Sequence, residues 1–186
     1  SIRRVMNKKI TSAQIKRAFA LTTRYGILAR AYFIYGSPGE NAQTIQATID
    51  LMHTIKPLSA IFYILDLFPG TALYQDYQQG QGVSDDIWIE RIEDIMYFET
   101  DDRLTRADIL AYGQQLRHTF YRHIGDYVHA IELVDDQTLY PWHADFFSRL
   151  GMTFSHGDYK NIDAILDKDG LAAYCYQKAL EYHPDQ

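Results

Sequence analysis

Cysteine is nearly absent from this sequence, and its scarcity excludes several kinds of site. Cys175 is the only cysteine among 186 residues. The chain therefore cannot build an internal disulfide, a cysteine-rich zinc site or an iron–sulfur cluster site from its own residues. We predict that the chain contributes no metal ligand.

Long apolar runs and an excess of positive charge are also lacking. No segment approaches the roughly 20 apolar residues that a membrane-spanning helix needs, and residues 1–9 are basic and polar, without the apolar core of a signal peptide. The chain has 18 Lys and Arg against 24 Asp and Glu, a net charge of −6, which argues against binding to phosphate backbones. We expect a cytoplasmic protein that binds neither nucleic acid nor membranes.

Hydrophobic residues make up 47% of the sequence, which is enough for a sizeable core. In the first 78 residues, helical and strand patterns alternate. They predict helices at 11–25 and 42–55 and buried strands at 27–35 and 59–67. A capping box formed by Thr11 and Gln14 marks the start of the first helix, and Gly26 its end. The order helix, strand, helix, strand predicts βαβ units in a parallel sheet.

The rest of the chain predicts helices and no further buried strand. Ser84 is suited to cap a helix that continues through Ile95, and Thr105 to cap a longer helix that Gly125 interrupts. A later apolar stripe predicts a helix that ends before Gly151.

The seven histidines form no recognisable metal or catalytic pattern. His143 and Asp145 are two residues apart, a spacing that places them on different sides of a helix. We predict that they are a surface pair, and we identify no catalytic side chain.

Three stretches carry a resemblance that composition and spacing do not supply. They are RVMNKKIT at 4–11, AYFIYGSPGE at 31–40 and FPGTALY at 68–74. Together they are similar to the later strands and helices of radical S-adenosylmethionine enzymes. In that family a full or partial (β/α) barrel holds a [4Fe-4S] cluster on a C-x-x-x-C-x-x-C loop after its first strand, and this loop is missing here.

The resemblance implies an α/β fold class: a half TIM-type barrel with βαβ units, followed by a mostly α-helical C-terminal region. Residues 1–78 would be the C-terminal half of the barrel, and residues 79–186 a helical extension. Residues 171–185, at the end of this extension, are similar to the second helix of a tetratricopeptide repeat. We interpret the chain as a piece of a longer protein.

The resemblance also implies cofactor-binding residues. In the family a G-x-I-x-G-x-x-E pattern on the fifth strand packs against the adenine of the cofactor, and Ile34 and Gly36 match its Ile and second Gly. Tyr32 stands where the first Gly would be, and Glu40 falls one residue after the motif's Glu. The sixth strand offers backbone atoms to the adenine edge, which implies Leu65. The cofactors implied for the parent protein are S-adenosylmethionine, a [4Fe-4S] cluster and, in the subgroup that this chain resembles, cobalamin.

Two functions of different classes are compatible with these observations. In the first, the parent enzyme cleaves S-adenosylmethionine to a 5′-deoxyadenosyl radical that acts on an unidentified small-molecule substrate, and this chain alone is inactive. In the second, the helical region is a non-catalytic module that binds a protein partner through exposed aromatics such as Trp88 or Trp142. The open strand edge of a half-barrel also predicts that the chain forms a homodimer or is poorly soluble.

Overall fold

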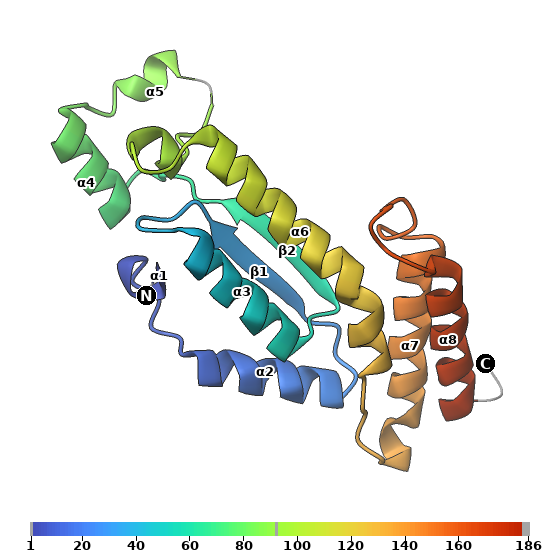
Figure 1. The fold of residues 1–186 in the computed structure, drawn as a ribbon. Coiled ribbons are helices and arrows are strands. Elements are labelled where there is room, and N and C mark those ends of the chain that lie inside the picture. Colours follow the sequence, from blue (N-terminus) through green and yellow to red (C-terminus); the bar gives the residue numbers. More distant parts are fainter. Residues whose placement is uncertain (1, 92, 184–186) are drawn as a thin grey trace. The chain divides into compact units, whose positions relative to one another are not determined.

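The computed structural model describes residues 2–91 and 93–183, and most of these residues are helical (Figure 1). The elements follow in the order α1 (Ile2–Val5), α2 (Ser12–Arg24), β1 (Arg30–Tyr35), α3 (Ala42–Ile55), β2 (Ser59–Ile64), α4 (Ala72–Gln81), α5 (Ile87–Glu90), η1 (Tyr97–Thr100), α6 (Arg106–His129), η2 (Gln137–Leu139), α7 (Tyr140–Ser155) and α8 (Lys168–Tyr182).

The chain divides into two compact units whose segments alternate along the sequence. Unit 1 consists of Ser1–Ile10, Tyr32–Thr48 and Phe62–Leu116, and unit 2 of Thr11–Ala31, Ile49–Ile61 and Arg117–Gln186. The elements β1, α3, β2 and α6 each contribute residues to both units. The boundary expected after residue 78 stays a prediction.

The predicted half TIM-type barrel with βαβ units is wrong. β1 and β2 are two parallel strands of one small sheet, and the described part of the chain contains no other sheet. Half a barrel needs several neighbouring parallel strands, whereas only two segments of the described residues form them. Strands do form within the two apolar runs, at Arg30–Tyr35 and Ser59–Ile64. The prediction that they are buried on both faces is wrong, because Tyr32, Ile34 and Tyr63 are exposed.

Helix starts follow from local side-chain chemistry. The Thr11 hydroxyl accepts a 3.2 Å hydrogen bond from the Gln14 amide, and the Gln14 side chain accepts a 2.8 Å bond from the Thr11 amide. This is the predicted capping box, and it satisfies two amides that the first turn of α2 would otherwise leave unpaired. The helix predicted at 42–55 is also confirmed, as α3.

The helix predicted from Ser84 through Ile95 is wrong. Among the described residues of this segment, which leave out Ile92, only the four of α5 are helical. Ile95 is buried, and its carbonyl accepts a 2.8 Å bond from the Leu67 amide. In unit 1 Ile95 packs with Leu67 and Tyr74. Pairing with the chain that follows β2 therefore replaces the helical hydrogen bonds that the apolar spacing suggested.

Two glycines that were expected to interrupt or end helices lie inside them. α6 continues through Gly125 and α7 through Gly151. A Cβ atom at Gly151 would lie 2.9 Å from the ring of Tyr176, and one at Gly125 would lie 3.6 Å from Leu171. The absence of a side chain at Gly151 lets α8 pack closely on α7, so this glycine serves helix packing.

α7 and α8 form an antiparallel hairpin in unit 2 (Figure 1). The ring of Tyr182 at the end of α8 contacts Tyr140 and stacks on Phe147 of α7, with centroid separations of 5.2 and 6.0 Å. At the other end of the hairpin the Ser155 and Tyr176 hydroxyls are 2.8 Å apart and hydrogen-bonded. Aromatic packing thus fixes the register of the hairpin. Its likeness to a tetratricopeptide repeat stays a prediction.

Candidate functional site

The candidate site in unit 1 is the turn that follows β1. Gly36 has a φ of +79° and is buried. A Cβ atom there would lie 3.2 Å from Ile109 Cδ1 and 3.4 Å from Ile64 Cγ2. Left-handed backbone and close neighbours both favour glycine at this position.

Glu40 holds this turn from inside. Its Oε2 accepts hydrogen bonds from the amides of Gly36 and of Ser37, the latter at 3.1 Å. Burial raises the pKa of Glu40, and the two amide bonds lower it only in part. The position was recognised from the sequence only as one residue away from a motif. Its role in fixing the turn follows from the folded backbone, which brings residues 36 and 40 together.

Leu65 lies next to this turn and is buried. Its amide donates a 2.8 Å bond to the Tyr35 carbonyl, and its carbonyl accepts a 2.8 Å bond from the Tyr97 amide. The structure thus brings Leu65 and Gly36 together. Only the second lone pair of the Leu65 carbonyl is left for an external donor, and the proposed contact with an adenine edge stays a prediction.

Ile34 lies on an exposed face of the sheet. Its side chain is 39% exposed, and the nearby Tyr32 and Tyr63 are 63% and 51% exposed. The two tyrosine rings are stacked, with centroids 6.2 Å apart and planes within 10°. Because side chains alternate along a strand, Ala31 and Tyr35 point the other way and are buried. The result is an apolar wall, formed by Tyr32, Ile34 and Tyr63, that ends at the Gly36 turn.

No iron–sulfur cluster fits the described residues. Within residues 2–91 and 93–183 no group of three His, Cys, Asp or Glu side chains is placed to hold a metal ion. Cys175 lies on α8 with no exposed surface, and burial raises the pKa of its thiol to about 12. A protonated, inaccessible thiol is a poor ligand.

The prediction that His143 and Asp145 both lie on the surface is wrong for His143. Its side chain is completely buried, with Nε2 3.0 Å from the Val134 carbonyl and Nδ1 buried without a hydrogen-bond partner. α7 turns this histidine toward the ring of Tyr182. Asp145 forms a 2.7 Å ion pair with Arg149 one helical turn later. The spacing argument separated the two side chains correctly but could not tell which side of α7 is covered.

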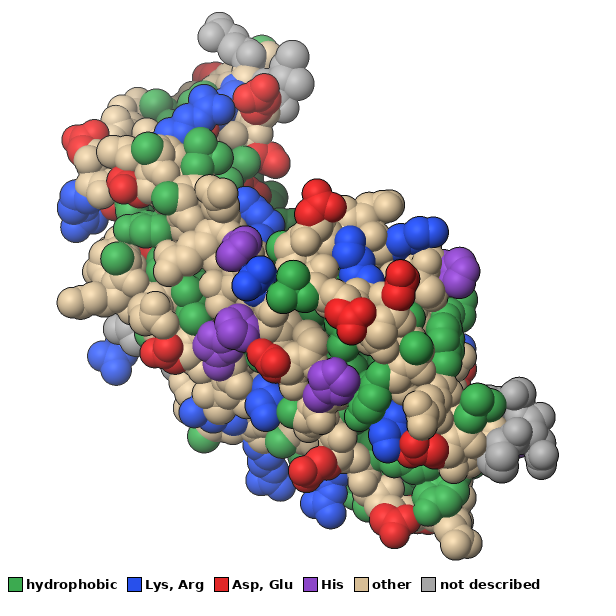
Figure 2. Space-filling view, turned by 45° about the vertical axis from the view of Figure 1, so that its right-hand side comes forward, with side chains coloured by type: hydrophobic (Ala, Val, Ile, Leu, Met, Phe, Trp, Pro, Cys, Tyr) green, Lys and Arg blue, Asp and Glu red, His purple; other side chains and the backbone are tan. Residues whose placement is uncertain are grey.

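The surface carries charges of both signs without a dominant basic region on the face that Figure 2 shows. In the described part of the chain no helix combines the length and the apolar character that crossing a bilayer requires.

Comparisons with known proteins give little further information. No family model matches the chain, and no solved structure matches it. An uncharacterized protein of Methanocaldococcus jannaschii is 36% identical over 53 residues, which are 28% of this chain and 10% of that protein. The chain thus spans only about a tenth of the length of this relative, and the match shows neither a family nor an activity.

Proposed function

We propose that this chain is part of a radical S-adenosylmethionine enzyme and contributes one wall of the site for the adenosine portion of the cofactor. The supporting observation is the apolar wall of Tyr32, Ile34 and Tyr63, which ends at the Gly36 turn. Ile34 and Gly36 are the residues that match the family's adenine-packing motif.

The wall suits a flat heterocycle. The two exposed tyrosine rings and the Ile34 side chain form an apolar surface next to a turn that Glu40 holds from inside. Stacking of a base on an aromatic side chain contributes about 1–3 kcal/mol. In this proposal the wall excludes water from one side of the adenine, and the Gly36 turn limits how far the base can move along the sheet.

The cluster does not fit this chain, so its ligands would have to come from residues outside this sequence. In the family, the cluster and S-adenosylmethionine together supply a 5′-deoxyadenosyl radical. The residues described here would bind and orient only the adenosine. Cobalamin remains a prediction that depends on the resemblance alone. The proposal places the protein in the cytoplasm, where a reducing environment keeps cysteine thiols free.

The first test measures adenosine binding directly. The isotope-labelled chain is titrated with 5′-deoxyadenosine, and the NMR signals of the Ile34 methyl groups and the Gly36 amide are followed. We expect saturable shifts at both positions, which Ile34→Asp abolishes. Ile89→Asp is the matched control, because Ile89 is 81% exposed on α5, away from the motif. Absent shifts, or equal losses in both variants, would refute an adenine wall at Ile34.

A second test addresses the parent enzyme. The reading frame upstream of Ser1 is sequenced, and the longer product is expressed and reconstituted with iron and sulfide. A C-x-x-x-C-x-x-C loop together with cluster absorbance supports the proposal. A longer product that contains neither contradicts it.

One observation favours the alternative function, a protein-interaction module. Trp142 in the first turn of α7 is 67% exposed, whereas Trp88 packs on the Tyr74 cluster of unit 1 and donates a 2.7 Å bond to its hydroxyl. Of the two tryptophans only Trp142 is therefore available as an anchor. Sedimentation of the wild-type chain and of Trp142→Gln over a range of concentrations tests whether this residue supports a homodimer. A wild-type chain that is monomeric at all concentrations excludes that form of the alternative.

A further inference from the structure

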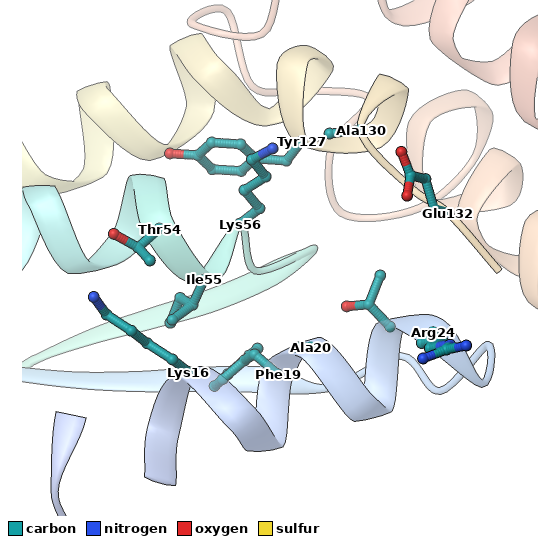
Figure 3. A pocket seen from close by; sticks show the side chains of 11 residues that line it. Lys16, Phe19, Ala20, Arg24, Thr54, Ile55, Lys56, Tyr127, Ala130 and Glu132 are labelled. Atoms are coloured by element: carbon teal, nitrogen blue, oxygen red, sulfur yellow. The ribbon is translucent and has the colours of Figure 1, made fainter. Parts of the chain in front are cut away.

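A cavity of about 220 Å³ opens in unit 2, where α2, α3 and α6 end (Figure 3). Phe19, Ile55 and Tyr127 supply much of its apolar lining. The volume is several times the roughly 30 Å³ that one water occupies in the liquid and is below the roughly 300 Å³ at which pockets for drug-sized ligands begin. The cavity can therefore hold a small group only.

Positive charge predominates around this cavity. Lys16, Arg24 and Lys56 line it, against a single carboxylate from Glu132. Across the described residues, none of these three cationic side chains has an ion-pair or hydrogen-bond partner. In Figure 3, Lys16 lies toward one end of the cavity, Arg24 and Glu132 lie toward the other, and Lys56 lies between them. The carboxylate of Glu132 is therefore at the end away from Lys16.

Helix dipoles explain only part of this arrangement. Arg24 ends α2 and Lys56 follows the last residue of α3, so both complement the partial negative charge of a helix C-terminus. Lys16 lies two turns before the end of α2, beyond the range of that effect. Its position at the cavity needs another reason.

The backbone of Lys56 is a second, independent observation. Its φ of +45° places it in the left-handed region, at a position where helices usually have glycine or asparagine. A lysine there costs conformational free energy, and residues held in such conformations concentrate at ligand sites. The left-handed conformation occurs at one of the residues that line the cavity.

We propose that this cavity binds a small oxyanion, the phosphate group of a phosphorylated small molecule. Lys16 and Lys56 would contact the phosphate oxygens, and Phe19 and Ile55 would cover a short apolar portion of the ligand. The site lies within unit 2 and is independent of the proposed adenosine wall.

The test uses the full chain and two probes, inorganic phosphate and pyrophosphate, titrated by calorimetry and by NMR at constant ionic strength. We expect saturable binding, with shifts at Lys16 and Lys56 that sodium chloride does not reproduce. Lys16→Gln should weaken binding by about tenfold, the loss expected for one charge-assisted hydrogen bond. Arg17→Gln is the matched control, because Arg17 is the next residue of α2, is exposed and does not line the cavity. It should bind phosphate as the wild type does.

Lys56→Gly separates binding from stability. Glycine adopts the left-handed conformation without strain, so this variant should melt at a higher temperature than the wild type while its phosphate affinity falls about tenfold. If Lys56 only ends a helix and does not contact phosphate, Lys56→Gly will bind phosphate as tightly as the wild type does. Non-saturable binding, an equal effect of chloride, or wild-type affinity in both Lys16→Gln and Lys56→Gly would overturn the proposal.

Discussion

The hydroxyl of Tyr159 donates a 2.8 Å hydrogen bond to the main-chain carbonyl of Leu58, and thereby joins residues 101 positions apart within unit 2. Both residues are buried. The bond ties the loop after α7 to the residue that immediately precedes β2. One phenol hydroxyl thus joins two segments that lie far apart in the sequence.

Tyr159→Phe removes this bond and keeps the ring. The Leu58 carbonyl would be left buried without its partner, so we expect the free energy of unfolding to fall by about 1–3 kcal/mol. Urea denaturation of both proteins measures the difference. Tyr25→Phe is the control, since Tyr25 is 49% exposed, and it should change stability by less than about 0.5 kcal/mol. Equal effects of the two substitutions would contradict a special role for the Tyr159 hydroxyl.

Gly151→Ala should destabilise the α7–α8 hairpin. The new methyl group would lie 2.9 Å from the Tyr176 ring, which must move and disturb its 2.8 Å bond to Ser155. We expect a loss of about 1–3 kcal/mol. Gly80→Ala in α4 is the matched control, because no atom lies within 4 Å of its added Cβ, and it should gain up to about 1 kcal/mol. Thermal melts of both variants should therefore shift in opposite directions.

The pH dependence of stability should report the buried Glu40. Because burial raises the pKa of this carboxyl in the folded protein, the stability that it contributes is complete below the pKa of the unfolded chain and is lost as pH rises through the folded pKa. Glu40→Gln cannot ionise, so it should gain stability relative to the wild type between pH 4 and pH 7. Urea midpoints at both values measure this change. Glu93→Gln, at an exposed site, should show no such trend.

Alkaline pH should destabilise the protein through Tyr127. Burial, with a smaller contribution from Asp126, raises the pKa of Tyr127 to about 12, while an unfolded tyrosine ionises near pH 10. Stability is therefore lost between about pH 10 and 12, and Tyr127→Phe should lose about 1 kcal/mol less than the wild type from pH 9 to pH 11. Tyr63→Phe, at a half-exposed position, should leave the slope unchanged. A wild-type slope in Tyr127→Phe would show that other groups control alkaline unfolding.

Local signals in the sequence located much of the secondary structure. Thr11 and Gln14 marked the start of α2, and the apolar spacing gave the bounds of α3, because capping and amphipathic packing involve residues within one or two turns of each other. The same reasoning failed at Gly151, where a glycine in the sequence looks the same whether it ends a helix or admits a neighbouring ring. It failed again at Ile95, whose partner is the chain after β2.

The candidate site, too, was only partly predictable from the sequence. Ile34, Gly36 and Leu65 were identified from a resemblance, and the fold brings Gly36 and Leu65 together. The sequence could not predict that Glu40 accepts hydrogen bonds from the turn. A carboxylate four residues after Gly36 can point in any direction until the backbone is fixed. Lys16 of α2 and Lys56, which follows α3, line one cavity, and no local sequence pattern indicated this.

The sequence by itself determined what this chain cannot build, because one cysteine excludes a cluster or a disulfide whatever the fold. It also determined where several helices begin, since those interactions are local. Only the tertiary structure decided that two strands pair and that no third strand joins them among the described residues. It also decided that His143 is buried and that three cationic side chains line one cavity. These features depend on contacts between residues far apart in the chain, and such contacts are selected by the packing of the whole core rather than by any segment alone.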